Sequence, residues 1–258
     1  MTMDESYPMS HSQKKAMRAI GIFLFTLVAL QAYAAEPRAV NPEDPYERLN
    51  RVFYDFNELV DKVVMRPIAR IYNLLIPKPI TKGVSHIFTN IDNIPTIAND
   101  LLQMNFYQAT SDAWRLLINT TIGIAGFFDV AAQIGLENNH EDLGLTFAQW
   151  GWKNSTYLVI PFLGPSTLRD GVAWPINYEL LTVYPYISPT GVRYAAYSTN
   201  LISKRADILR YQDVMEQAAL DKYVFMRNAY MQNRSYQIER NKQLGDPYLE
   251  KNNLGKLE

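Results

Sequence analysis

The sequence of 258 residues carries 25 Lys and Arg against 26 Asp and Glu, a net charge of −1, and has no cysteine. The balanced charge argues against nucleic acid as a partner, because proteins that bind nucleic acid concentrate positive charge on one surface. Without cysteine, these residues form no disulfide, thiol nucleophile or cysteine-based metal site.

The first 34 residues have the pattern of a signal peptide. Basic residues precede an apolar run over residues 19–30, which is shorter than the about 20 residues that cross a bilayer. Ala32 and Ala34 supply the small residues that signal peptidase requires, so we expect cleavage after Ala34. The alternative is an uncleaved membrane anchor.

From residue 44 onward, apolar residues recur at three- and four-residue spacing, which predicts amphipathic helices. Asp44 is expected to cap a first helix that begins at Pro45. Arg66-Pro67 is expected to restart the chain, and another helix to begin near Pro95. Sustained two-residue alternation, the mark of a half-buried strand, is missing. The sequence therefore predicts an all-α fold in a single compact domain.

Two segments in the middle of the chain differ from this pattern. Gly123 and Gly126 form a glycine pair, expected to be flexible, beside the bulky Phe127 and its neighbours. Residues 157–165 form a continuous apolar run, which is too short to cross a membrane. This run fits either a buried strand-like segment or a loop that dips into an apolar layer.

The last third of the chain again predicts helices. Ser166 or Thr167 is expected to cap one of them, and the last long helix is expected near residues 213–242. No internal repeat is found, so we predict one domain. The expected divisions are a signal peptide, a flexible leader, a helical domain and a disordered tail, at residues 1–34, 35–43, 44–243 and 244–258.

Catalytic and metal-binding patterns are missing. The histidines left after the leader do not have the spacing of metal ligands, and no phosphate-binding loop or nucleophile elbow occurs. The best enzymatic candidate is Ser166 with His140 as base and Asp142 or Asp170 as the orienting group. A helix cap explains Ser166 more simply, and a polar capping loop explains His140. We therefore predict no enzymatic activity, no cofactor and no metal.

Three blocks of residues spread from residue 44 to residue 170 form a recognisable pattern. They read Asp44-Pro45-Tyr46-Glu47-x-x-Asn50-Arg51-x-x-Tyr54-x-Phe56-Asn57 with Arg66-Pro67-x-Ala69, then Asn119-Thr120-Thr121-x-Gly123-x-x-Gly126-x-x-Asp129-x-Ala131, then Glu141-Asp142-x-Gly144-x-Thr146, Trp150-Gly151 and Tyr157-Leu158-Val159-x-Pro161-x-x-Gly164-Pro165-Ser166-x-x-Arg169-Asp170. In this order they resemble the signature of the MlaA/VacJ family of outer-membrane lipoproteins. Residues 171–258 add little to the resemblance.

The resemblance implies a disc- or ring-like helical protein on the periplasmic side of the outer membrane. Its amphipathic channel would let mislocalised phospholipid leave the outer leaflet, with a trimeric porin and a periplasmic lipid carrier protein as partners. We expect an apolar wall and a flexible rim beside this lipid path. The residues expected there are Gly123, Gly126, Phe127, Tyr157, Leu158, Val159, Pro161 and Gly164.

The sequence departs from the family pattern at two points. The family's leader ends in an acylated cysteine, which is missing here, so retention would rest on embedded helices or on a porin. Residues 153–156 replace the glycines and proline that the family tends to have before Tyr157. The main alternative function is a soluble periplasmic lipid-binding module, and a third is a lipid-cleaving enzyme that uses Ser166.

Overall fold

The computed structural model describes residues 44–244, with the side chains of residues 213–218 and 242–244 excepted. The expected signal peptide, the leader and residues 245–258 of the expected disordered tail lie outside the described residues. In chain order the elements are α2 (Glu47–Val60), a π-helix (Asp61–Met65), α3 (Arg66–Leu75), α4 (Lys78–Leu102), α5 (Phe106–Thr121), α6 (Val130–Gln133), α7 (Leu143–Gln149), β1 (Tyr157–Ile160), β2 (Gly164–Thr167), α8 (Leu168–Leu181), a 3-10 helix (Tyr184–Tyr186), α9 (Thr190–Ala218) and α10 (Lys222–Leu244).

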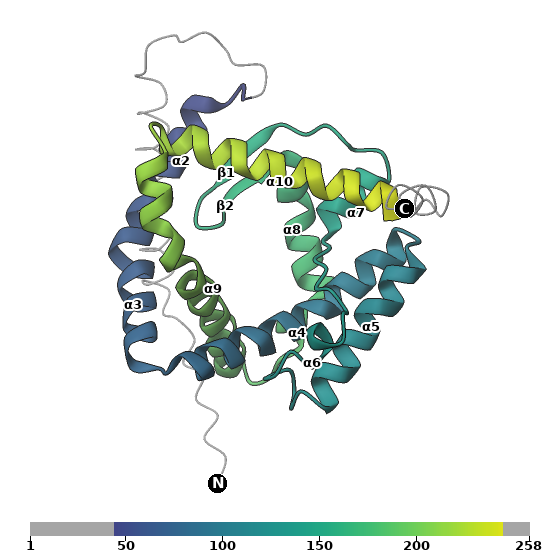
Figure 1. The fold of residues 1–258 in the computed structure, drawn as a ribbon. Helices are drawn as coiled ribbons and strands as arrows, with labels where there is room; N and C mark the ends of the chain where they lie inside the picture. Colours follow the sequence, from purple (N-terminus) through teal and green to yellow (C-terminus); the bar gives the residue numbers. More distant parts are fainter. Residues whose placement is uncertain (1–43, 245–258) are drawn as a thin grey trace, which may run out of the picture.

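The helices are arranged as a ring (Figure 1). In that view α3 and α4 form two adjoining sides, and α10 runs along the opposite edge. Helix α3 packs on α9, α4 packs on α5, and α10 packs on α7 and β2. The mostly helical, ring-like domain expected from the sequence is confirmed.

A small β-hairpin interrupts the helical ring. Strands β1 and β2 are antiparallel, with Tyr157 opposite Thr167 and Ile160 opposite Gly164. The strand-like alternative for residues 157–165 is therefore correct, and the fold is mostly rather than entirely helical. Each strand has only four residues, which is too short for two-residue alternation to be recognised against an apolar background.

Three expected helix boundaries are wrong. The last long helix, expected near residues 213–242, is α10 and begins at Lys222, while α9 extends to Ala218. Helix α2 begins at Glu47, and the Asp44 side chain accepts a hydrogen bond from Asn50 Nδ2 at 2.8 Å instead of capping the helix. Pro95 lies inside α4, which continues through it. The Asn99 side chain donates to the Pro95 carbonyl at 2.8 Å, one turn further along, and this bond does not replace the backbone donor that proline lacks.

Two caps of later helices agree with the expected capping pattern. Thr167 caps α8, since its side chain accepts a hydrogen bond from the Asp170 N–H at 3.2 Å. Asp142 caps α7 by accepting from the Leu145 N–H at 3.0 Å. These contacts satisfy N–H groups that a helix leaves without partners in its first turn, and they fix where α7 and α8 start.

Candidate functional site

The outer surface of α4, α5 and the following turn is apolar. Between residues 83 and 136 no exposed side chain is charged. The large exposed apolar residues of this stretch are Ile94, Leu101, Leu102, Met104, Phe106, Tyr107, Trp114, Leu117, Ile122, Ile124, Phe128 and Ile134. We call this stretch the apolar exterior. Soluble monomers rarely expose such a surface, which indicates contact with lipid or protein. Among residues 44–244, no helix is both long and apolar enough to cross a membrane.

The same stretch places its charged groups inside. Asp100, Asp112 and Arg115 are at most 1% exposed. Arg115 Nη2 donates to both carboxylate oxygens of Asp129 at 3.2 Å, and Asn119 Nδ2 donates to Asp129 at 3.0 Å. The polarity is thus the reverse of that in a water-soluble helical hairpin, since apolar groups lie outside and charges lie between the helices.

Two cavities lie on opposite faces of the β-hairpin formed by β1 and β2. The first, with a volume of about 320 Å³, has many ionisable groups in its lining, and we call it the polar cavity. The second, of about 380 Å³, has a mainly apolar lining, and we call it the apolar cavity. Leu163 and Pro165 line both. Val159 lines only the apolar cavity and Ile160 only the polar cavity, because consecutive strand residues point to opposite faces.

The longest helices also contribute to both cavities. On α9, Lys204 lines the polar cavity while Arg205 and Ile208 line the apolar one. On α10, Arg234 lines the polar cavity and Phe225 the apolar one. The hairpin, α9 and α10 therefore form a shared partition between the two spaces.

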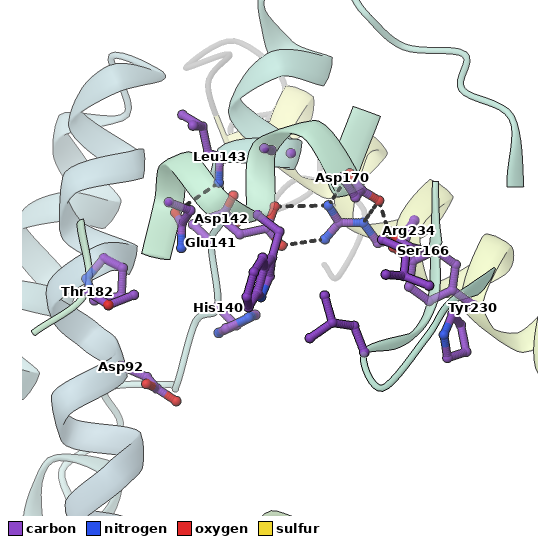
Figure 2. A pocket seen from close by; sticks show the side chains of 18 of the residues that line it. Asp92, His140, Glu141, Asp142, Leu143, Ser166, Asp170, Thr182, Tyr230 and Arg234 are labelled. Carbon is purple, nitrogen blue, oxygen red and sulfur yellow. Dashed lines mark hydrogen bonds and ion pairs between the residues drawn. The ribbon is translucent and has the colours of Figure 1, made fainter. Parts of the chain in front are cut away.

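Arg234 joins two aspartates at one wall of the polar cavity, as Figure 2 shows. Its guanidinium donates to Asp142 at 2.8 and 3.0 Å and to Asp170 at 2.8 and 3.1 Å. The Tyr230 hydroxyl donates to Asp170 at 2.7 Å. Burial alone would raise the pKa of Asp142 and Asp170, but Arg234 outweighs it and holds both pKa values below the ordinary range. Both carboxyl groups are therefore ionised, and they hold α7, α8 and α10 together.

Ion pairs also line the apolar cavity. Asp61 of the π-helix accepts from Arg205 of α9 at 2.6 Å and from Arg66 at 2.7 Å. Arg66 also reaches Glu58 at 3.1 Å. The π-helix thus provides the carboxylate that ties α2 and α3 to α9. The rest of the lining is largely apolar, and includes Tyr54, Val159, Leu163, Ile208, Phe225 and Met226.

The hairpin residues expected beside a lipid path lie at or near these cavities. Val159 and Gly164 line the apolar cavity, while Tyr157 is fully buried against Tyr223 and Tyr230 in the core. Leu158 and Pro161, both half-buried, line neither cavity. Helix α2 holds β1 through two asparagines seven residues apart. Asn50 bonds the Tyr157 carbonyl and the Val159 N–H, and Asn57 bonds the Ile160 carbonyl and the Phe162 N–H.

The glycine turn lies elsewhere. Gly123, Gly126 and Phe127 line neither cavity. A Cβ on Gly123 would meet the Phe128 carbonyl oxygen at 2.3 Å, and one on Gly126 would meet Asn90 Cβ at 2.6 Å. Gly126 also has φ +88, which side chains disfavour. Both glycines are therefore required for close packing, and this turn presents its apolar neighbours on the apolar exterior.

The first family block joins the two ends of the ring. Asp44 accepts hydrogen bonds from Asn50 and the Tyr223 hydroxyl and contacts Arg227 of α10 at 3.5 Å. Arg51 pairs with Asp221 at 2.8 Å and lies over the Tyr223 ring at 4.4 Å. These residues therefore have a structural role as a latch between the start of α2 and the start of α10.

The other blocks are structural too. Asn119 and Asp129 form the cluster around Arg115 described above, and Arg66 joins the π-helix to α2. Arg169 donates to Asp170 at 2.9 Å and to the carbonyls of residues 152 and 153 at 3.2 and 3.1 Å, which ties the loop before β1 to α8. Pro45 and Pro67 lie at the starts of α2 and α3 and make none of these side-chain contacts.

Sequence reasoning missed the role of α10. Arg227, Arg234 and Asn241 follow one another at seven-residue spacing and are all buried. Their partners are the carboxylates of Asp44, Asp142 with Asp170, and Glu141. Seven residues are about two helical turns, so this spacing is a signal of one polar buried face. It was hidden because buried arginines are rare and a charged helix normally faces water.

The enzymatic candidate finds no support in the geometry. Ser166 and His140 both line the polar cavity, but Ser166 Oγ donates to the Thr167 carbonyl at 3.2 Å. Asp142 and Asp170 are both occupied by Arg234. Within residues 44–244, no group of three or more His, Asp or Glu side chains is placed to hold a metal ion.

Comparisons with known proteins agree with this picture. The family model for the MlaA lipoprotein matches residues 42–237. An uncharacterised protein of Rickettsia bellii is 33% identical over 198 residues, which cover 76% of this chain and 77% of the relative. The intermembrane phospholipid transport system lipoprotein MlaA of Escherichia coli is 29% identical over 199 residues, covering 75% and 77%. A solved structure that addresses the maintenance of bacterial outer-membrane lipid asymmetry matches with a TM-score of 0.65 and 25% identity, covering 76% of this chain and 98% of that chain.

Proposed function

Since the chain belongs to the MlaA lipoprotein family, we propose that it removes mislocalised phospholipid from the outer leaflet of the outer membrane through an amphipathic channel. Family membership makes it a phospholipid-transport protein and not an enzyme. The lipid would pass to a periplasmic lipid carrier protein, with a trimeric porin holding the ring in place. Neither partner is present in the structure, and both belong to the proposal.

The observation that carries the proposal is the reversed polarity of the ring. The apolar exterior suits a position among lipid tails, while the ionisable groups lie inside, around the polar cavity. A phospholipid that crosses such a ring needs an apolar surface for its tails and a polar one for its headgroup. The two faces of the hairpin supply both.

We place the lipid path along the hairpin, with Val159 and Gly164 in its wall. The segment from Tyr157 to Pro165 provides the wall, and the turn at Gly123 and Gly126 is the proposed outer rim. The wall is supported by the observation that residues of this segment line both cavities. The rim is supported by the exposure of Ile122 and Ile124, which neighbour the two glycines.

Complementation of a strain that lacks the native gene tests this function. Outer-leaflet phospholipid accumulation is read as detergent sensitivity. Val159→Asp should block rescue, because an unpaired charge at a buried apolar site costs several kcal/mol. Val192→Asp is the matched control, since Val192 is exposed on α9 and lines neither cavity. Full rescue by folded, membrane-located Val159→Asp would place the path elsewhere.

The soluble periplasmic module is tested by extraction. Carbonate washing of membranes should leave the protein with the membrane fraction if the apolar exterior is embedded in lipid. Release of all of the protein into the soluble fraction, with rescue intact, would favour a lipid-binding module that works from the periplasm.

A further inference from the structure

Most charged groups in the two cavities are already engaged with one another. The five N–H groups of the Arg234 guanidinium make four hydrogen bonds to Asp142 and Asp170 and one to Gln237 at 3.2 Å, so this arginine has no donor left for a ligand phosphate. In the apolar cavity, Arg205 is bound by Asp61 and by Gln212 at 2.6 Å. A phospholipid headgroup would therefore have to meet other groups.

One ion pair in the polar cavity is open to exchange. Lys204 Nζ of α9 contacts Asp92 Oδ2 of α4 at 2.8 Å, and the Lys204 side chain is 58% exposed. Both residues line the polar cavity. An exposed ion pair contributes little to stability. Lys204 can therefore exchange Asp92 for an anion of a ligand, and Asp92 can exchange Lys204 for a cation, at little cost in free energy.

The apolar cavity has a different lining. Ile208, Phe225, Met226 and Val159 supply hydrocarbon surface from α9, α10 and β1. Its carboxylates, Glu58 and Asp61, are held by arginines of the lining, and the remaining charged residue, Lys222, is exposed at the start of α10. This space favours an acyl chain over a charged group, because desolvating an unpaired charge is costly.

We infer that the hairpin divides a bound phospholipid, with the headgroup in the polar cavity and an acyl chain in the apolar cavity. Leu163 and Pro165 lie at the border, where the glycerol would pass. The headgroup chemistry that fits is zwitterionic. Its phosphate binds Lys204 and its ammonium binds Asp92. This inference rests on the proposed function and makes it more specific.

The same geometry disfavours an anionic headgroup without an ammonium. Its phosphate would take Lys204 and leave Asp92 without a cation, since Arg234 is fully engaged. The protein should therefore retain phosphatidylethanolamine in preference to phosphatidylglycerol with the same acyl chains. An exposed pair of this kind supports a preference of about two- to fivefold.

The arrangement is tested by photo-crosslinking with the full chain purified in detergent. Two phosphatidylethanolamine probes are used, one with a diazirine at the end of an acyl chain and one with a diazirine on the carbon chain of the headgroup, which leaves the amine free to carry its charge. Mass spectrometry then locates the labelled peptides. The acyl probe should label α9 near Ile208 and α10 near Phe225, and the headgroup probe should label α4 near Asp92 or residues 140–144, which line the polar cavity.

A pair of matched substitutions makes the test specific. Ile208→Trp fills part of the apolar cavity and should lower labelling by the acyl probe about tenfold while leaving headgroup labelling in place. Ile71→Trp is the control, because Ile71 of α3 is equally exposed at 54% and lines neither cavity. Asp92→Asn should reduce the preference for phosphatidylethanolamine over phosphatidylglycerol to near unity.

The outcomes separate this inference from the proposed function. If both probes label the same peptides, or label them in reverse, the division is wrong although the protein still binds phospholipid. Equal retention of the two lipid classes by the unaltered chain overturns the zwitterionic assignment. Labelling in the expected pattern without rescue in the complementation strain supports the division and contradicts the transport function. No specific labelling by either probe contradicts both.

Discussion

Two pairs of buried aspartates are stabilised in different ways. Asp142 and Asp170, on the side of the ring that α10 covers, share Arg234 and stay ionised. Asp100 and Asp112 lie behind the apolar exterior, between α4 and α5. Burial, followed by the neighbouring charge of Asp112, raises the pKa of Asp100 to about 9. The pKa of Asp112 is also raised, chiefly by burial.

A shared proton explains the second pair. Asp100 Oδ2 and Asp112 Oδ1 are buried and have no donor among the described residues. The two carboxyl groups share one proton, because burial and the charge of Asp112 favour the protonated form of Asp100. Arg115, the nearest arginine on α5, is bound to Asp129. The buried aspartates on the α10 side of the ring are thus stabilised by ion pairs with Arg234. Those behind the apolar exterior are stabilised by protonation.

The largest effect is expected from Arg234→Met. It leaves Asp142 and Asp170 as buried carboxylates without their cation, and breaking a buried pair in this way costs about 3–5 kcal/mol. Denaturant unfolding followed by circular dichroism measures the loss. Arg70→Met is the control, because Arg70 of α3 is exposed and should change stability by less than about 0.5 kcal/mol. Equal losses in the two variants would contradict an ionic role for Arg234.

A charge introduced on the apolar exterior should weaken membrane association and leave the folding of the protein unchanged. Leu117→Lys places a cation on the exposed face of α5, where insertion into lipid costs about 2.5–3.5 kcal/mol at the centre of a bilayer. The variant should fold in detergent but be released from membranes by carbonate.

Gln232→Lys provides the control for that prediction. Gln232 is exposed on α10, among other uncharged polar residues. A lysine at this position adds the same charge outside the apolar exterior, so the variant should remain in the membrane fraction. If both variants stay in the membrane, the exterior of α5 faces protein or water and not lipid.

Opposite pH dependence should separate the two aspartate pairs. The folded state holds a proton at Asp100 and Asp112 that the unfolded chain releases, so this pair lowers stability as pH rises from about 4 toward 9. Asp112→Asn supplies an amide donor to Asp100 and should flatten that loss. For Asp142 and Asp170, whose pKa values are lowered, the stabilisation is present above the ordinary pKa and is lost as pH falls through the folded value.

The measurement is the unfolding free energy at several pH values for both variants. Asp112→Asn should be more stable than the unaltered chain near the alkaline end, while Asp170→Asn should be less stable at neutral pH. A parallel pH profile in the two variants would show that the pairs do not differ in protonation.

The features predicted from the sequence are those that local patterns specify. Helix periodicity gave the helical class, and Asp142 and Thr167 precede their helices in the usual capping pattern. Val159 and Gly164, which line the apolar cavity, belong to a continuous apolar run that is visible within one segment of the sequence. These properties depend on neighbours in the chain, so a single sequence contains them.

The remainder depends on contacts between distant residues. Asp44 looks like a cap but serves as the partner of Tyr223 and Arg227, which lie 179 and 183 residues further along the chain. The reversed polarity of α4 and α5 also escapes periodicity, since an amphipathic helix has the same period whichever face turns outward. The two cavities require the hairpin, α9 and α10 together, and no segment alone indicates them.

The smallest effect is expected at Ser166, which lines the polar cavity. Its hydroxyl makes one hydrogen bond, to the Thr167 carbonyl, and the cap of α8 is Thr167 itself. Ser166→Ala should therefore lower stability by less than about 1 kcal/mol and preserve rescue of the outer-membrane barrier. Thr167→Ala, the matched comparison, should cost about 1 kcal/mol because it removes the cap. If Ser166→Ala alone abolished rescue in a protein that is folded and correctly located, the polar cavity would have to perform chemistry on the lipid, and its ion pairs would no longer be explained by structure alone.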